Sequence, residues 1–365
     1  MPPPKSRVAD RRAVLKPPAR SLFRPLRGLA LVGAATLVAS ASWAQASAPA
    51  SAPAGDAQAR DVRGWLLRIH EAASHRNFQG TFVVSGGGAV SSARIAHFCE
   101  GPNQFERSEA LDGQARHVYR HNDVVTTLWP TNKTAMVEQR DSLAQFPALL
   151  QAGGDRIADF YDVRPQGAER VAGREADVLL VKPRDGFRYG YRLWADQTSG
   201  LLLRADVIGE RNEVLESSAF SDVTINVRPQ PESVLLPMKK LDGYRVVRPV
   251  LTPTRLEAEG WTMRDSVPGF RQVSCVKRPM GGTGKPEKAA GEQQALQSIF
   301  SDGLTYVSVF IEPFDPQRHT RPMQASVGPT QTLMQQQGDW WVTVLGDVPP
   351  ATLLLFAKGL ERSRK

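Results

Sequence analysis

Short segments in which apolar and polar residues alternate with a period of two dominate the chain from Phe78 to Asn226. Turn signals separate these segments, among them Gly86-Gly87-Gly88, Gly101-Pro102-Asn103 and Asp112-Gly113. Such alternation is typical of half-buried strands, and short turns join antiparallel neighbours. The sequence therefore predicts a mostly antiparallel β meander in which every strand pairs with its sequence neighbour. We expect the sheet to be strongly curved and nearly closed, with one or two helices on its concave side.

Helical periodicity appears at three places. Residues 61–77 carry Leu66 and Ile69 at helical spacing, which predicts a helix that packs on the sheet. Residues 141–153 predict a helical insert in the meander. Residues 351–362 follow two prolines and predict a helix that closes the chain.

Composition divides the chain into two folded parts. Residues 227–250 hold four prolines, which is typical of a linker. We therefore expect a large domain over residues 60–226, an inter-domain linker over 227–250 and a smaller, β-rich domain over 251–365. The predicted fold class is α+β, mostly antiparallel β, and each part is long enough to bury its own core.

The first 44 residues have the composition of a signal peptide. Residues 1–27 carry eight basic residues and one acidic residue, whereas residues 28–44 carry no charge and end with small residues at Ser42 and Ala44. The apolar run is shorter than the ~20 residues of a membrane span, which argues against the alternative of an uncleaved anchor. We expect export of the protein, with residues 45–59 as a disordered linker because they are rich in Ala, Ser and Pro.

Charge gives no indication of a nucleic-acid partner. The formal net charge of the full chain is +9. Most of this charge comes from the leader, which carries eight basic residues and one acidic residue. The mature chain is therefore close to neutral, whereas a nucleic-acid-binding domain needs a basic patch on its folded surface.

Cys99 and Cys275 are the only cysteines. An even pair in an exported protein is a candidate disulfide, and here it would clamp the two domains together. Two separate buried thiols are the alternative. His117 and His121 share a strand face, but four residues of strand span about 13 Å, which is too far for one metal ion. We interpret both histidines as surface residues.

Familiar catalytic motifs are absent from the sequence. It holds no G-x-S-x-G elbow, no H-E-x-x-H pair and no phosphate-binding loop of the G-x-x-x-x-G-K-[ST] type. We therefore predict a binding protein without catalytic, cofactor-binding or metal-binding residues. A hydrolase whose site is assembled from distant residues remains the alternative.

Residues 184–207 form a hairpin that is rich in aromatic and leucine residues. Core packing explains such a pattern in any curved sheet. The functional alternative is that one face of the hairpin lines an apolar cavity that encloses a lipid-like ligand. The candidate cavity-lining residues are Phe187, Tyr189, Tyr191, Leu193, Leu201 and Leu203.

Five separate segments carry a family resemblance. They are NFQGTFVV at 77–84, ARIAHFCEGPNQFERSEALDGQARHVYRHNDVVTTLWP at 93–130, RDGFRYGYRLWADQTSGLLLRADVIGERNEVLESSAFSDV at 184–223, SDGLTYVSVFIE at 301–312 and VTVLGDVPPAT at 342–352. In this order and spacing they resemble the RseB/MucB family of sigma-E factor regulatory proteins, and the resemblance runs over nearly the whole mature chain.

The resemblance implies a periplasmic regulator without an enzymatic role or a cofactor. Members of the family bind the periplasmic domain of a membrane anti-sigma factor of the RseA/MucA type and shield it from site-1 proteolysis, and acyl chains of lipopolysaccharide or lipoprotein are the implied release signal. The large domain is expected to resemble the lipoprotein carrier LolA, a half-barrel with a hydrophobic cavity. A lipoprotein or lipid carrier is the alternative function, and homo-oligomerisation stays open.

Overall fold

The structure is a computed structural model that describes residues 54–139, 157–280 and 294–363. The predicted leader and the helix expected over residues 141–153 lie outside the described residues. Helix α1 spans Ala54–His75, so it begins within the segment that was expected to be a disordered linker.

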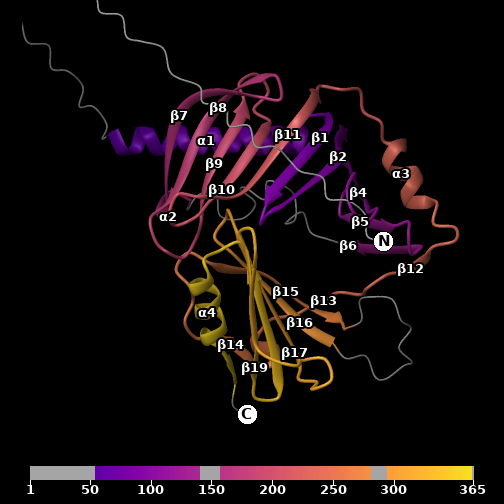
Figure 1. The fold of residues 1–365 in the computed structure, drawn as a ribbon, viewed down its shortest axis with the longest axis vertical. Helices are drawn as coiled ribbons and strands as arrows, with labels where there is room; N and C mark the ends of the chain where they lie inside the picture. The colour runs from indigo at the N-terminus through magenta and orange to yellow at the C-terminus, as the bar shows by residue number, and fades with distance from the viewer. Residues whose placement is uncertain (1–53, 140–156, 281–293, 364–365) are drawn as a thin grey trace, which may run out of the picture. The chain divides into compact units, whose positions relative to one another are not determined.

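Twelve strands form one large sheet, which is antiparallel except where β12 runs parallel to β6 (Figure 1). The strands are β1 (Phe78–Gly86), β2 (Ala89–Glu100), β3 (Asn103–Ala110), β4 (His117–His121), β5 (Val124–Trp129), β6 (Thr134–Gln139), β7 (Tyr161–Val171), β8 (Arg174–Pro183), β9 (Gly190–Asp196), β10 (Leu202–Ile208), β11 (Val214–Ile225) and β12 (Arg245–Val247). Their order is β12-β6-β5-β4-β3-β2-β1-β11-β10-β9-β8-β7. The sheet is therefore open, with β12 and β7 at its edges.

The pairing differs from the predicted meander at one place. Strands β6 and β7 follow each other in the sequence but lie far apart in the sheet, and β1 pairs with β11 instead. Gly80 permits this pairing, because a Cβ at that position would lie 2.1 Å from the backbone oxygen of Asp222 on β11. The first and last strands of the meander therefore meet in the middle of the sheet.

Helix α1 packs against the large sheet and lies across its strands in Figure 1. Leu66 and Ile69 are buried in one core with Leu179 and Leu193 of the sheet. One turn further along the helix, Ala72 joins a second core. The helix predicted from the spacing of Leu66 and Ile69 is thus confirmed, and its apolar side covers strands β8 to β10.

The segment expected as a linker is partly structured. It contains helix α3 (Glu232–Lys239) and strand β12, which extends the large sheet. Val234 of α3 is fully buried in a core with Phe98 and Phe105 of the sheet. The domain boundaries themselves stay a prediction, but part of this segment packs on the large sheet.

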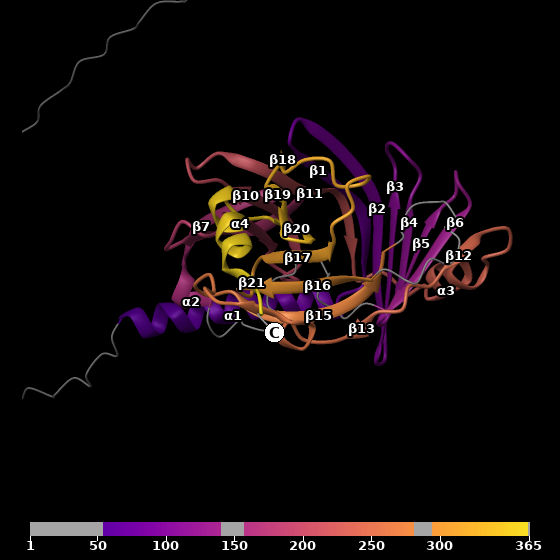
Figure 2. The same ribbon diagram turned by 90° about the horizontal axis from the view of Figure 1, so that it is seen from below.

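Seven strands form a second, smaller sheet in the order β13-β15-β16-β17-β20-β19-β18. They span Thr252–Pro253 (β13), Arg271–Pro279 (β15), Gln294–Ser301 (β16), Tyr306–Pro313 (β17), Met323–Val327 (β18), Thr330–Gln337 (β19) and Trp340–Gly346 (β20). Figure 2 shows β15, β16 and β17 side by side. A short strand pair, β14 (Trp261–Met263) and β21 (Leu360–Arg362), and the 3-10 turn η3 (Glu257–Glu259) accompany this sheet.

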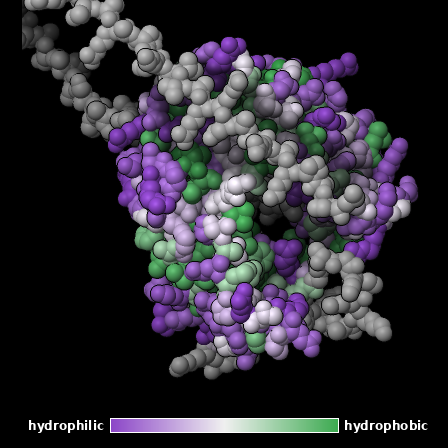
Figure 3. Space-filling model, in the orientation of Figure 1, coloured by the Kyte–Doolittle hydropathy of each residue, from purple (hydrophilic) through white to green (hydrophobic). Residues whose placement is uncertain are grey.

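Helix α4 (Pro350–Gly359) packs against β19 and β20 of the smaller sheet. The sequence predicted a helix over residues 351–362, but its last three residues form β21 instead. Leu353 and Phe356 of α4 are buried in one core with Val307, Val309 and other residues of the strands. The region of α4 also carries apolar surface in Figure 3, and Leu355 is one of its exposed residues. The second part of the chain therefore has a core of its own.

Candidate functional site

A cavity of about 870 Å³ lies between α1 and the large sheet. This volume is within the range of ~300–1,000 Å³ that is typical of small-molecule sites. The lining residues come mainly from β1 to β5, and fewer come from the last turns of α1, from the start of β10 and from β11. The cavity thus occupies the half of the sheet that α1 does not fill.

Aromatic rings form the apolar part of the cavity. Phe220 of β11 packs edge to face against Phe78 and Phe82 of β1, with ring centroids 5.9 and 5.2 Å apart. Ile95 of β2 and Leu201 also line this part. Such a surface binds hydrocarbon because it removes apolar area from water.

Charged side chains form the other part of the cavity. Glu106 and Arg107 of β3, Arg120 of β4 and Arg116 before β4 line it. Arg120 Nη1 lies 3.6 Å from Glu106 Oε2, so these two side chains pair with each other. An amphipathic ligand would match both parts, with its apolar portion on the rings and its polar portion on the charged wall.

His97 of β2 lies between the two parts. Its ring stacks on Phe78 at a centroid distance of 5.4 Å, and Nδ1 lies 2.8 Å from the backbone oxygen of Arg76. Burial lowers the pKa of His97, and the hydrogen bond to the Arg76 carbonyl and the charge of Glu106 oppose this effect only in part. The imidazole is therefore held in its neutral form at the edge of the cavity.

Only one of the six predicted lining residues borders this cavity, namely Leu201. Tyr191 and Leu193 pack beneath α1, Leu203 lies in the core around Trp194, Tyr189 is buried, and Phe187 packs against the core of the smaller sheet. Leu66 and Ile69 of α1 fill the space over β8 to β10, so the aromatic hairpin serves mainly as core. Of the two roles considered for the hairpin, core packing and cavity lining, these positions favour core packing.

The residues that form the apolar part of the cavity were not among the predicted lining residues. Phe78 and Phe82 are separated by four positions on β1, which puts both rings on one face of the strand. That spacing was visible in the alternating segment NFQGTFVV. The position of Phe220 beside them was not visible, because it depends on the pairing of β1 with β11.

The two cysteines are free in the structure. Cys99 lies on β2 and its Sγ donates to the backbone oxygen of Ser74 at 3.1 Å, whereas Cys275 lies on β15 in the core of the smaller sheet. Burial raises the pKa of both thiols. The structure thus holds two separate thiols and does not form the candidate disulfide.

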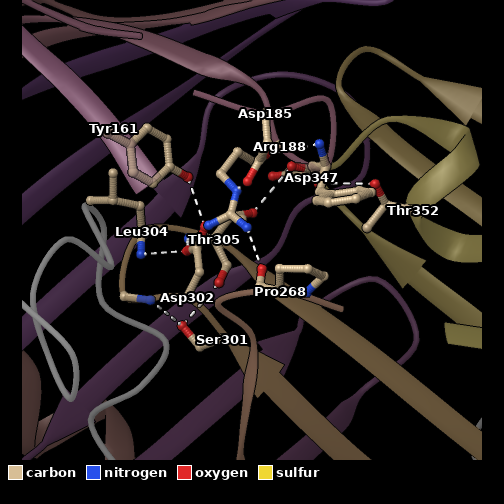
Figure 4. A network of polar contacts seen from close by, with 12 residues as sticks. Tyr161, Asp185, Arg188, Pro268, Ser301, Asp302, Leu304, Thr305, Asp347 and Thr352 are labelled. Atoms are coloured by element: carbon tan, nitrogen blue, oxygen red, sulfur yellow. Dashed lines mark hydrogen bonds and ion pairs between the residues drawn. The ribbon is translucent and has the colours of Figure 1, made fainter. Parts of the chain in front are cut away.

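A buried polar network joins residues of the large-sheet segment to residues of the smaller-sheet segment (Figure 4). Arg188, which precedes β9, is fully buried and its Nη1 lies 3.0 Å from Oδ2 of Asp302. Tyr161 donates its hydroxyl hydrogen to the same Oδ2 at 2.8 Å. The remaining guanidinium nitrogens of Arg188 donate to Asp185 and to the backbone oxygen of Pro268.

Aromatic rings and turn geometry hold this network in place. Phe160 and Phe270 flank the Arg188 guanidinium, with ring centroids 4.6 and 5.1 Å from its central carbon, which adds cation–π attraction. Asp302 lies in the hairpin turn between β16 and β17, where its Oδ1 accepts hydrogen bonds from the amides of Leu304 and Thr305. Both charged groups are therefore held by further neighbours in addition to each other.

Within residues 54–139, 157–280 and 294–363, no group of three or more His, Cys, Asp or Glu side chains is placed to hold a metal ion. Among the same residues, none of the helices combines the length and apolar character that a membrane crossing requires.

Comparison with known proteins decides the family. Residues 61–239 match the model of the MucB/RseB N-terminal domain, and residues 255–361 match the model of the MucB/RseB C-terminal domain. The chain belongs to the MucB/RseB family. The resemblance found in the sequence is thereby confirmed.

Two relatives show how far the similarity of this MucB/RseB family member extends. The sigma factor AlgU regulatory protein MucB of Pseudomonas aeruginosa is 29% identical over 307 residues, which cover 81% of this chain and 89% of the relative. The sigma-E factor regulatory protein RseB of Escherichia coli is 24% identical over 310 residues, which cover 84% of this chain and 92% of the relative.

Solved structures of family members share the fold. The complex of MucA and MucB from Pseudomonas aeruginosa matches with a TM-score of 0.62 at 28% identity, covering 84% of this chain and all of the other. A crystal structure of MucB matches with a TM-score of 0.60 at 26% identity. The predicted architecture, a curved, mostly antiparallel sheet with a separate smaller β-rich domain, is confirmed.

Proposed function

We propose that this protein is a negative regulator of a sigma-E type envelope-stress response. It binds the periplasmic domain of a membrane anti-sigma factor and shields that domain from site-1 proteolysis, without chemistry of its own. The observation that carries the proposal is the match to the MucB/RseB family over both domains. A MucB that is 28% identical to this chain has been solved in complex with MucA(peri), which supports the choice of partner.

The proposed location is the periplasm. The cationic segment, the uncharged run and the small residues at Ser42 and Ala44 have the order of a cleavable export signal. An anti-sigma factor that presents a periplasmic domain requires its regulator in the same compartment. Location and partner therefore support each other.

Acyl chains of lipopolysaccharide or lipoprotein are the proposed release signal. The cavity of about 870 Å³ with its aromatic lining supports this part of the proposal, because it can bury a hydrocarbon chain. A ligand shifts the equilibrium between bound and released regulator only by its difference in affinity for the two forms. The acyl ligand must therefore bind the released regulator more tightly than the complex.

A lipoprotein or lipid carrier is the alternative function, and the same cavity favours it. A carrier needs the cavity but has no use for the second domain with its own core. Binding of the purified chain to the anti-sigma periplasmic domain distinguishes the two functions, because a carrier has no reason to bind that domain.

A protease-protection assay tests the proposal. The anti-sigma periplasmic domain is incubated with the site-1 protease alone, with this protein, and with this protein plus a long-chain fatty acid. We expect cleavage to slow in the second mixture and to recover in the third. Equal cleavage in the first two mixtures would overturn the regulator function, and protection that no acyl ligand relieves would overturn the release signal.

A further inference from the structure

Strand β18 forms one edge of the smaller sheet. In the described part of the chain it pairs with β19 alone, and all five of its residues, Met323 to Val327, are exposed. An edge strand of this kind presents unpaired backbone N–H and C=O groups, which form a template for another strand.

This edge lacks the usual protection against strand addition. Residues 323–338, which include β18 and β19, carry no charged side chain, although 23% of the residues in the whole chain are charged. The register runs without a bulge from the pair Met323–Met334 to the pair Val327–Thr330. Natural edges are usually blocked by lysine, by proline or by a bulge, and β18 itself has none of these.

The register shows which groups of β18 face outward. Residues 328 and 329 form a two-residue turn, so the closing pair Val327–Thr330 is a hydrogen-bonded pair. Hydrogen-bonded and non-hydrogen-bonded residue pairs then alternate along the two strands. The backbone groups of Gln324 and Ser326 therefore point to the open edge. These are the groups that a further strand would pair with.

The side chains of β18 define what kind of strand fits. Gln324 and Ser326 lie opposite the buried residues Leu333 and Gln331 and so share the inner face. Met323, Ala325 and Val327 lie on the outer face, and Met323 and Val327 are 43% and 70% exposed. A partner strand with apolar residues at alternate positions would cover this stripe.

Charges flank the uncharged edge at both ends. Arg321 is exposed two residues before β18. At the other end, Glu216 lies beside the turn, since its Oε2 is 3.8 Å from the position that a Cβ on Gly328 would take. A segment with an acidic residue at the Arg321 end and a basic residue at the Glu216 end is complementary to this arrangement.

The surroundings of the edge favour a single segment over a second folded copy of the chain. The β1–β2 turn abuts the β18–β19 turn, because a Cβ on Gly87 would lie 2.8 Å from the backbone nitrogen of Gly328. One added strand needs only about 4.8 Å beside the edge. A second copy would also bring its own β1–β2 turn to the same place.

We propose that β18 is the docking strand for an extended, largely apolar segment of the anti-sigma periplasmic domain, which adds to the smaller sheet by main-chain hydrogen bonds. This inference rests on the proposed function and names the surface that performs it. A segment whose backbone is paired with β18 is withheld from a protease that needs the same backbone groups. Strand addition thus supplies a physical reason for shielding.

The test compares two substitutions at one position. Gln324→Pro removes an outward N–H group and places a ring at the open edge, whereas Gln324→Ala removes only the side chain. If the main chain carries the recognition, binding of the anti-sigma periplasmic domain should weaken at least tenfold with proline and by less than twofold with alanine. Hydrogen exchange of the wild-type chain should show slower exchange of residues 323–327 in the complex, and this readout holds even if the proline variant loses stability.

The outcomes separate this inference from the proposed function. If the wild-type chain binds the anti-sigma domain but β18 gains no protection and the proline variant binds normally, the docking strand is refuted and the regulator function stands. If the wild-type chain does not bind at all, the proposed function fails and the docking strand fails with it. Protection of β18 that grows with the concentration of this protein alone would assign the edge to a second copy and would also refute the inference.

Discussion

The guanidinium of Arg188 and the carboxylate of Asp302 form an ion pair of 3.0 Å between two side chains that are both 0% exposed. The residues are 114 positions apart in the sequence and belong to the segments of the two different sheets. Tyr161, Asp185 and the backbone oxygen of Pro268 satisfy their other hydrogen-bonding groups. A buried pair with this many partners tolerates the loss of neither member, because the remaining charge would stay buried without compensation.

Replacement of either member of this pair should destabilise the protein strongly. We expect Arg188→Met and Asp302→Asn each to lower the free energy of unfolding by about 3–5 kcal/mol, as measured by urea denaturation. The double variant should be more stable than the sum of the two single losses predicts, because neither charge is then left alone. Arg211→Met, which removes an exposed partner of Glu213, serves as the control and should match the wild type. Single losses below about 1 kcal/mol would contradict a structural role for the pair.

Gly269 is required beside this ion pair. Its φ is +86°, and a Cβ at this position would lie 2.9 Å from Arg188 Nη1 and from Phe160 Cζ. Gly243 has a φ of +75° but no atom within 4 Å of such a Cβ, so it carries the same backbone strain without the clash. We expect Gly269→Ala to cost about 1–3 kcal/mol more than Gly243→Ala in thermal or urea unfolding. Equal losses would mean that the neighbourhood of Arg188 adjusts freely.

His97 should make the stability of the protein dependent on pH. Burial lowers its pKa in the folded state below the value of about 6.5 that the unfolded chain has. As the pH falls below 6.5, the unfolded chain takes up a proton that the folded protein resists, so stability is lost in this range and is fully present above it. Urea midpoints at pH 8 and pH 5.5 should therefore differ more for the wild type than for His97→Gln. The prediction fails if both proteins show the same dependence on pH.

Filling the cavity should abolish binding of an acyl ligand. Ala93 lies on β2 and lines the cavity, so Ala93→Trp would occupy the space beside the aromatic rings. Ala89 lies on the same strand but is exposed at the turn and does not border the cavity, which makes Ala89→Trp the control. Titration with a fluorescent fatty acid should give at least tenfold weaker binding for Ala93→Trp and unchanged binding for Ala89→Trp. Unchanged binding by both variants would place the acyl site elsewhere.

Both cysteines should behave as free thiols. Unfolded protein should react with two equivalents of a thiol reagent, and its migration on a gel should not change with reductant. In the folded protein, the raised pKa values of Cys99 and Cys275 should make the reaction slow at neutral pH, because little thiolate is present. A migration shift after reduction, with no reactive thiol in the unfolded chain, would show instead that the pair is bridged.

Much of the local structure could be predicted from the sequence. The alternating segments became strands. The spacing of Leu66 and Ile69 predicted the helix that covers the sheet. These features depend on residues that are close in the sequence, where the strand period of two and the helix period of 3.6 leave a direct record.

The candidate site was predicted much less well. Tyr191 and Leu193 have the alternation of cavity-lining residues, but that alternation is the same whether a helix or a ligand covers the strand. The side chains of α1 decide between the two, because Leu66 and Ile69 fill the space over this part of the sheet. Arg188 likewise carries no local signal of its role, since Asp302 and Pro268 reach it from distant segments.

The sequence by itself determined the strand-rich character of the chain, its two-part organisation and its family. Only the tertiary structure decided that β1 pairs with β11, that the cavity lies over β1 to β5 and that Arg188 meets Asp302. The physical reason is that side-chain alternation records which face of a strand is buried, whereas partners across long sequence separations are selected by the packing of the whole molecule.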